Sequence, residues 1–129
     1  MQHNQEKMQG CIDTCNACRD ECEQTLFQHC LSMGGKHVEE KHVRLMADCI
    51  EICQTAANFM LRGSDQHAFV CGACAEICEA CAESCEAIGG EEMKRCAEVC
   101  RQCAESCREM SRMQGTHGKE TGQATRRAV

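Results

Sequence analysis

The sequence predicts an all-α protein, an up-down-up-down antiparallel four-helix bundle with a cysteine-lined core. Three observations lead to this prediction. Cysteines recur at steps of three and four residues, the chain contains no proline, and glycines divide it into four segments. Steps of three and four return a side chain to one face of an α-helix, whereas the two-residue period of a strand would scatter the same residues over both faces.

The cysteine stripes define the inward face of each predicted helix. Residues 71–85 carry five cysteines at steps of 3, 4, 3 and 4, and residues 11–22 and 96–107 each carry four at steps of 4, 3 and 4. The second helix contributes only Cys49 and Cys53. These spacings follow the a/d-type register that a bundle turns toward its interior. Fifteen of the sixteen cysteines obey this register, so we predict that thiols fill the core.

Glycines mark the joints between the helices. Gly34-Gly35, Gly63 and Gly89-Gly90 separate segments whose lengths suit single helices. We therefore predict helices at about residues 4–33, 38–62, 65–88 and 91–113, joined by loops so short that neighbours must be antiparallel. These four helices form one domain, residues 1–113. Residues 114–129 lose the apolar period and predict a polar, flexible C-terminal tail.

Composition narrows the classes of function. The 129 residues include sixteen cysteines, no tryptophan, no tyrosine and three phenylalanines, so aromatic side chains cannot fill the core. A net charge of −6 argues against a nucleic-acid partner. No apolar run is long enough to span a membrane, and residues 1–10 lack the apolar stretch of a signal peptide. We expect a cytoplasmic protein, whose thiols stay reduced.

Stripes of reduced thiols indicate a store for soft metal ions. Thiolates at i, i+3 or i, i+4 can clasp one ion, and a facing helix can add a third ligand. Such ligands select Cu(I), zinc or iron–sulfur clusters. No Lys or Arg lies on the stripes, and Zn²⁺ bound to four thiolates would leave a buried charge of −2 at each site. Cu(I), at about one ion per thiolate, leaves the interior close to neutral. The sequence therefore favours multiple Cu(I) ions per chain.

Other interpretations stay open. The stripes could store zinc or another soft metal, or could form a disulfide or thiol redox helical scaffold. Cysteine could also serve as a small apolar core residue. Iron–sulfur clusters need four thiolates converging on one cluster, which a continuous stripe on straight helices does not present. No inward acid–base pair or phosphate loop is visible, so we expect no enzymatic activity.

The two ends of the bundle carry imidazole and thioether side chains. At the end with the first and third loops, the candidate ligands are His29, Met33, His42 and Met46, with Met93 nearby. The opposite end has Met8, Met60, His67 and Met110. Cys30 lies about a quarter-turn off the stripe, so we expect it at the rim, although it remains a candidate ligand. His3, His37 and His117 are expected at the surface.

Four helices, repeated Cys-x-x-x-Cys-x-x-Cys stripes and His/Met ends resemble the cytosolic bacterial copper storage proteins, over about residues 4–113. The resemblance implies storage and buffering of Cu(I) and assembly into homotetramers. A copper chaperone or exporter is a candidate partner. It implies that Cu(I) is held by the matching cysteines, which are Cys11, Cys15, Cys18, Cys22, Cys49, Cys53, Cys71, Cys74, Cys78, Cys81, Cys85, Cys96, Cys100, Cys103 and Cys107.

Overall fold

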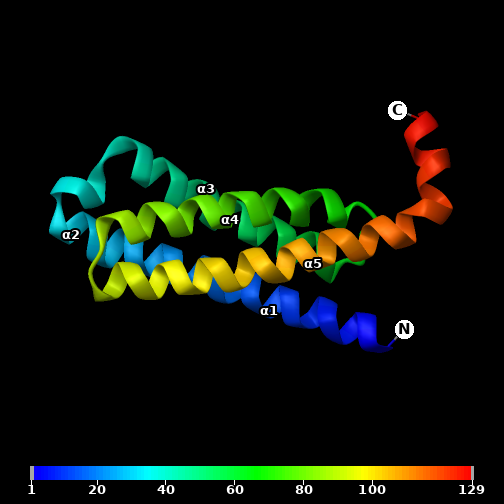
Figure 1. The fold of residues 1–129 in the computed structure, drawn as a ribbon, viewed down its shortest axis with the longest axis horizontal. Helices are drawn as coiled ribbons and strands as arrows, with labels where there is room; N and C mark the ends of the chain where they lie inside the picture. Colours follow the sequence, from blue (N-terminus) through cyan, green and yellow to red (C-terminus); the bar gives the residue numbers. More distant parts are fainter. Residues whose placement is uncertain (1, 129) are drawn as a thin grey trace.

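In the computed structural model, four helical arms run antiparallel around a common core (Figure 1). The structure describes the backbone of residues 2–128 and the side chains of residues 4–113. The elements in chain order are α1 (Gln2–Gln24), the π-helical turn η1 (Thr25–Cys30), α2 (Leu31–Met33), the 3-10 turn η2 (Gly35–Val38), α3 (Glu40–Leu61), α4 (His67–Ile88) and α5 (Glu91–Ala128). The four arms are α1 with η1 and α2, then α3, α4 and α5. The first arm and α4 each pack against both α3 and α5, which confirms the predicted four-helix bundle.

Glycines end the helices at the joints that the sequence indicates. Gly63 has φ of +68° after α3, and Gly89 has φ of +85° after α4, a region that L side chains avoid. The Gly63 and Ser64 amides donate to the carbonyls of Met60 and Phe59 at 3.1 and 3.0 Å, so the last turn of α3 is capped. These tight turns reverse the chain within a few residues and make neighbouring helices antiparallel.

The fourth arm is longer than the helix predicted at about residues 91–113. Its backbone is helical from Glu91 to Ala128, past residue 113. The side chains of the predicted polar tail, residues 114–129, lie outside the described part, and its flexibility stays a prediction. Among the described helices, none has the length and apolar character needed to cross a membrane.

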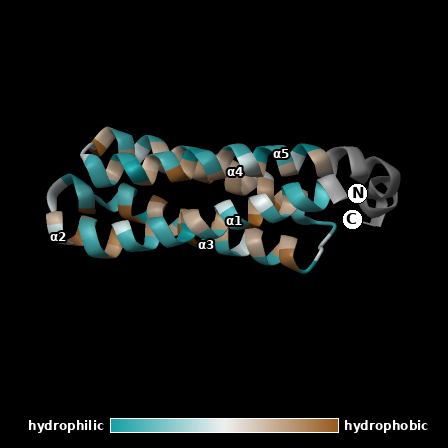
Figure 2. Ribbon diagram, turned by 90° about the horizontal axis from the view of Figure 1, so that it is seen from below, coloured by the Kyte–Doolittle hydropathy of each residue, from teal (hydrophilic) through white to brown (hydrophobic). Residues whose placement is uncertain are grey.

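Small and sulfur-containing side chains fill the core in place of aromatics. All sixteen cysteines are buried, and Phe27 and Phe69 are exposed. Hydrophilic and hydrophobic bands alternate along each helix, as expected when one face is buried (Figure 2). The remaining core is made of alanines and methionines, with Ile12 and Leu26: Met46, Ala56, Ala57, Met60, Ala75, Ala82, Met93, Ala97, Ala104 and Met110.

The π-helical turn η1 corrects one prediction. Cys30 was expected at the rim, but its side chain is fully buried. The Leu31 amide donates to the carbonyl of Leu26, five residues earlier, which adds one residue to the turn. One extra residue rotates the following positions by about 100°. Cys30 therefore turns inward, while Met33, predicted on the stripe, is 59% exposed.

Candidate metal centre

The cysteines form one continuous column of thiols through the bundle. All sixteen are free, and each has a relative exposure of 0%. The stripes of the four arms meet here because the a/d register aims every sulfur at the bundle axis. The column runs from Cys11 and Cys107, whose sulfurs lie 3.6 Å apart, to Cys22 and Cys96, 3.7 Å apart, and on toward Cys30.

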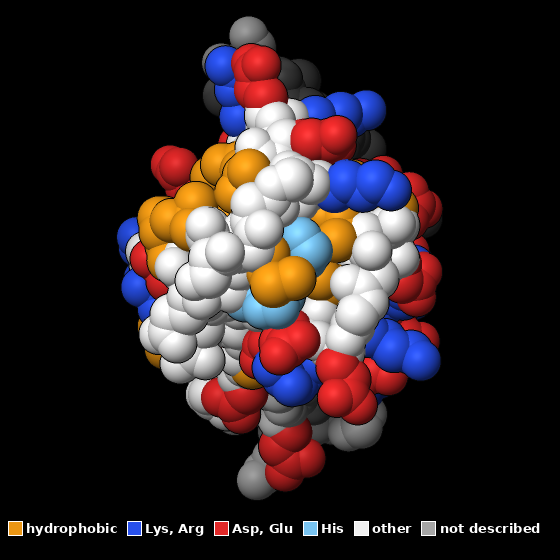
Figure 3. Space-filling view, turned by 90° about the vertical axis from the view of Figure 1, so that its left-hand side faces the viewer, with side chains coloured by type: hydrophobic (Ala, Val, Ile, Leu, Met, Phe, Trp, Pro, Cys, Tyr) orange, Lys and Arg blue, Asp and Glu red, His pale blue; other side chains and the backbone are white. Residues whose placement is uncertain are grey.

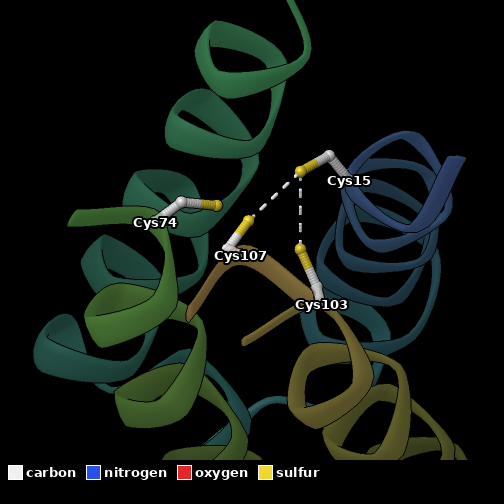
Figure 4. Close-up of side chains that lie close together, drawn as sticks. All are labelled: Cys15, Cys74, Cys103 and Cys107. Carbon is white, nitrogen blue, oxygen red and sulfur yellow. Dashed lines mark hydrogen bonds between the residues drawn. The ribbon is translucent and has the colours of Figure 1, made fainter. Parts of the chain in front are cut away.

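Three groups of four thiols lie in the middle of this column, each with its Sγ atoms within 4.8 Å of one another. Every group draws on at least three arms, so none could be built by one helix. Figure 4 shows the first group, in which the Cys15 sulfur lies 3.5 Å from that of Cys107 and 3.7 Å from that of Cys103. The groups are Cys15, Cys74, Cys103 and Cys107; Cys18, Cys53, Cys78 and Cys103; and Cys18, Cys22, Cys49 and Cys100.

Shared cysteines join the groups to one another. Cys103 belongs to the first and second groups, and Cys18 belongs to the second and third. The Cys18 sulfur lies 3.8 Å from the sulfurs of both Cys49 and Cys100. A thiolate in such a position can bridge two ions, so the column is a ladder of connected sites.

Spacing and charge together limit which ion suits the column. A tetrahedral ion with bonds of about 2.3 Å to sulfur requires sulfurs about 3.8 Å apart, so the spacing accepts zinc as well as copper. Charge separates the two ions. The buried polar side chains among those described are Thr25, His42 and His67, with no Lys or Arg to neutralise excess thiolate charge. Monovalent ions at about one per thiolate leave this interior close to neutral.

The column ends in a mixed set of donors at the end bearing α2. The Cys30 sulfur lies 3.7 Å from Nε2 of His42 and 3.8 Å from the Met93 thioether sulfur. On the other side of the ring, Nδ1 of His42 lies 2.8 Å from the Ser84 hydroxyl, which fixes the ring orientation. Burial raises the pKa of the Cys30 thiol to about 11. Burial also lowers the pKa of His42, which favours the neutral imidazole that binds metal.

The sequence of this thiol-lined bundle matches a known protein family. The chain matches the family model described as copper storage protein over residues 4–112. It belongs to the copper storage protein family. The comparison with curated proteins finds no match.

Three solved structures resemble this copper storage family member throughout the bundle. A protein from Nitrosospira multiformis is 54% identical, with a TM-score of 0.81, over 84% of this chain and 98% of that one. The Cu(I)-bound copper storage protein BsCsp3 is 32% identical, with a TM-score of 0.76, over 81% and 98%. Apo-Csp3 from Bacillus subtilis is 34% identical, with a TM-score of 0.72, over 80% and 97%.

The other predicted end residues divide between interior and surface. Met46 is fully buried one turn before Cys49. His29 does not join the sulfurs: its Nε2 lies 3.9 Å from a carboxylate oxygen of Glu92, and its ring contacts His37, which was expected to be a surface residue. The roles of Met46 and His29 as copper ligands stay predictions.

Sequence reasoning missed Ser84, the hydroxyl that orients His42. Ser84 precedes Cys85 on the polar side of its stripe, where it resembles any solvated residue of α4. At the opposite end of the column, Met60, His67 and Met110 are buried as the stripes predict. Nδ1 of His67 donates to the Ser64 carbonyl at 3.0 Å.

Proposed function

We propose that this protein stores and buffers Cu(I), holding many ions per chain along the thiol column. The observation that carries the proposal is the continuity of the column: neighbouring sulfurs from all four arms lie 3.5–3.9 Å apart. No Lys or Arg is buried among the described residues, so the interior has no cationic side chain. Membership in the copper storage family and the Cu(I)-bound state of one relative also support Cu(I) storage.

Loading exchanges protons for copper. The buried thiols are held neutral in the empty column, because unpaired buried thiolates are costly. Each arriving Cu(I) displaces a proton from a thiol, so positive charge leaves as positive charge enters. An ion can then move along the ladder by releasing one thiolate while binding the next. Shared ligands such as Cys18 and Cys103 make each step a short one.

The bundle is built before the metal arrives. In the relatives, both the apo-Csp3 and the Cu(I)-bound structures match this chain's fold. Here the buried alanines and methionines supply helix packing that does not require an ion. We therefore expect circular dichroism of the reduced, metal-free protein to show full helicity, whereas an unfolded apo form would mean that the metal drives folding.

Zinc storage is the second candidate, because the sulfur spacing also suits a tetrahedral ion. Competition separates the two. Reduced protein is loaded with Zn²⁺ and titrated anaerobically with Cu(I), while released zinc is followed with a chromophoric chelator. Copper storage predicts complete release of zinc. Zinc retained against a stoichiometric excess of Cu(I) would favour the second candidate.

We assign the protein a non-enzymatic role in the cytoplasm, where a reducing environment keeps sixteen thiols free. A copper chaperone or exporter would deliver and collect the ions. We also propose a homotetramer, supported by exposed apolar side chains outside the bundle, at Phe27, Leu31, Leu61 and Phe69. Light scattering on the purified protein tests this assembly, and a monomeric mass would contradict it.

A further inference from the structure

Two histidines and a glutamate gather over the end of the bundle that bears α2. The imidazole rings of His29 and His37 meet edge to face, with centroids 5.2 Å apart. Nε2 of His29 also lies 3.9 Å from Oε1 of Glu92, a residue of α5. Three separate elements, η1, η2 and α5, supply these side chains. Figure 3 shows histidine side chains together on this face, with acidic and apolar groups around them.

These donors form a second layer, outside the thiol column. His29 precedes Cys30, and Glu92 precedes Met93, in the chain. Cys30 and Met93 point inward and are fully buried, whereas the side chains of His29 and Glu92 are 22% and 49% exposed. Both η1 and α5 therefore present sulfur to the interior and nitrogen or oxygen to the outside, and η2 adds His37 to the outer layer. The outer layer is accessible to an ion in solution even when the column is full.

The outer donor set suits a different class of metal from the column. Imidazole with carboxylate suits borderline divalent ions such as Zn²⁺, whereas Cu(I) prefers sulfur. Two imidazoles on a tetrahedral Zn²⁺, with bonds of about 2.0–2.1 Å, place their ring centroids about 5.2 Å apart, which matches the spacing of His29 and His37. Glu92 completes the set by rotation of its half-exposed side chain.

We propose that His29, His37 and Glu92 form a separate site for one divalent borderline metal ion of the Zn²⁺ class, placed over the end of the thiol column. The site takes two imidazole nitrogens and one carboxylate oxygen from the chain, and water fills the remaining position. The described contacts of His29 are with His37 and Glu92 and not with a thiol of the column, so the ion can bind there while the column holds Cu(I).

Zinc binding to protein with filled thiols tests the proposal. The column is first saturated with Cu(I), and in a parallel sample with Ag(I), another soft monovalent ion, so that the test does not depend on copper loading. Zn²⁺ is then titrated against a chromophoric chelator, while imidazole resonances are followed by NMR. The expected result is one further equivalent of Zn²⁺, with shifts of the His29 and His37 signals. Co²⁺ in place of Zn²⁺ should show no thiolate charge-transfer band.

Variants assign the ligands. His29→Gln and His37→Gln should each abolish the additional equivalent, and Glu92→Gln should weaken it. Glu91→Gln, a matched change on the same helical turn, should leave it intact. Circular dichroism and the Cu(I) capacity of every variant verify that the bundle and column are unchanged. Absence of the additional equivalent in both filled samples, or its persistence in either histidine variant, would overturn the proposal.

Discussion

The Cys30 sulfur lies 3.7 Å from Nε2 of His42, although the sequence register places Cys30 at the rim. The π-helical turn η1 makes this contact by rotating Cys30 inward. The same rotation brings the Cys30 sulfur within 3.8 Å of the Met93 sulfur. The column therefore ends in a thiol and a thioether, which are soft ligands for Cu(I), beside an imidazole, which also suits copper, and we propose that these donors form its terminal site.

If the extra residue of η1 only sets the register, deleting Phe27 should be tolerated. Phe27 is 54% exposed within this turn, and its removal restores an α-helical turn while Cys30 still faces inward. Deleting Ala17, an exposed residue of α1 between Cys15 and Cys18, instead rotates part of the stripe by about 100°.

Chemical denaturation and Cu(I) titration of the two deletion variants check this contrast. The Phe27 deletion should keep its copper capacity. The Ala17 deletion should lose about 4 kcal/mol or more of stability, as severe core disruptions do. Equal damage in both variants would show that η1 does more than correct the register.

Removing the Ser84 hydroxyl should weaken the terminal site without changing the number of ions bound. Ser84 fixes the His42 ring through a 2.8 Å contact with Nδ1, and losing such a supporting contact typically costs about 10–100-fold in metal affinity. Ser84→Ala should therefore release its most weakly held Cu(I) to a chelator more readily. Ser32→Ala, at an exposed serine that bonds only to the Gln28 carbonyl in the described contacts, serves as the control and should match the wild type.

Replacing a cysteine that belongs to two of the four-thiol groups should remove more bound Cu(I) ions than replacing a cysteine that belongs to none. Cys18 belongs to two of the four-thiol groups, whereas Cys71, equally buried, belongs to none of them. If thiolates are shared between ions, Cys18→Ala lowers capacity by about two ions and Cys71→Ala by about one. Elemental analysis of Cu(I)-saturated variants measures both, and equal losses would argue against bridging by Cys18.

Much of this architecture can be predicted from the cysteine spacing alone. Steps of three and four fix both the helices and the face that each one buries, and glycines at 63 and 89 fix the turns. The position of Cys30 could not be predicted, because an assumed 3.6-residue turn carries no sign of the inserted residue in η1. Ser84 was not predicted, and His37 was predicted only as a surface residue, because their contacts with His42 and His29 join different elements, which no periodicity within one helix reveals.

Metal-free protein should lose stability in alkaline solution. Burial raises the pKa of the Cys30 thiol from 9.0 to about 11 in the folded state. The unfolded chain thus loses this proton first, so the stabilisation is complete below pH 9 and disappears as the pH rises toward 11. Denaturation curves between these values should show a smaller decline for Cys30→Ala than for the wild type. Parallel declines would mean that Cys30 does not contribute.

Anaerobic titration of fully reduced protein with Cu(I), followed by elemental analysis, tests the storage function most directly. A column in which each thiolate accompanies about one ion predicts saturation at roughly 12 to 18 Cu(I) per chain, with a comparable number of protons released. Saturation at one or two equivalents would contradict it.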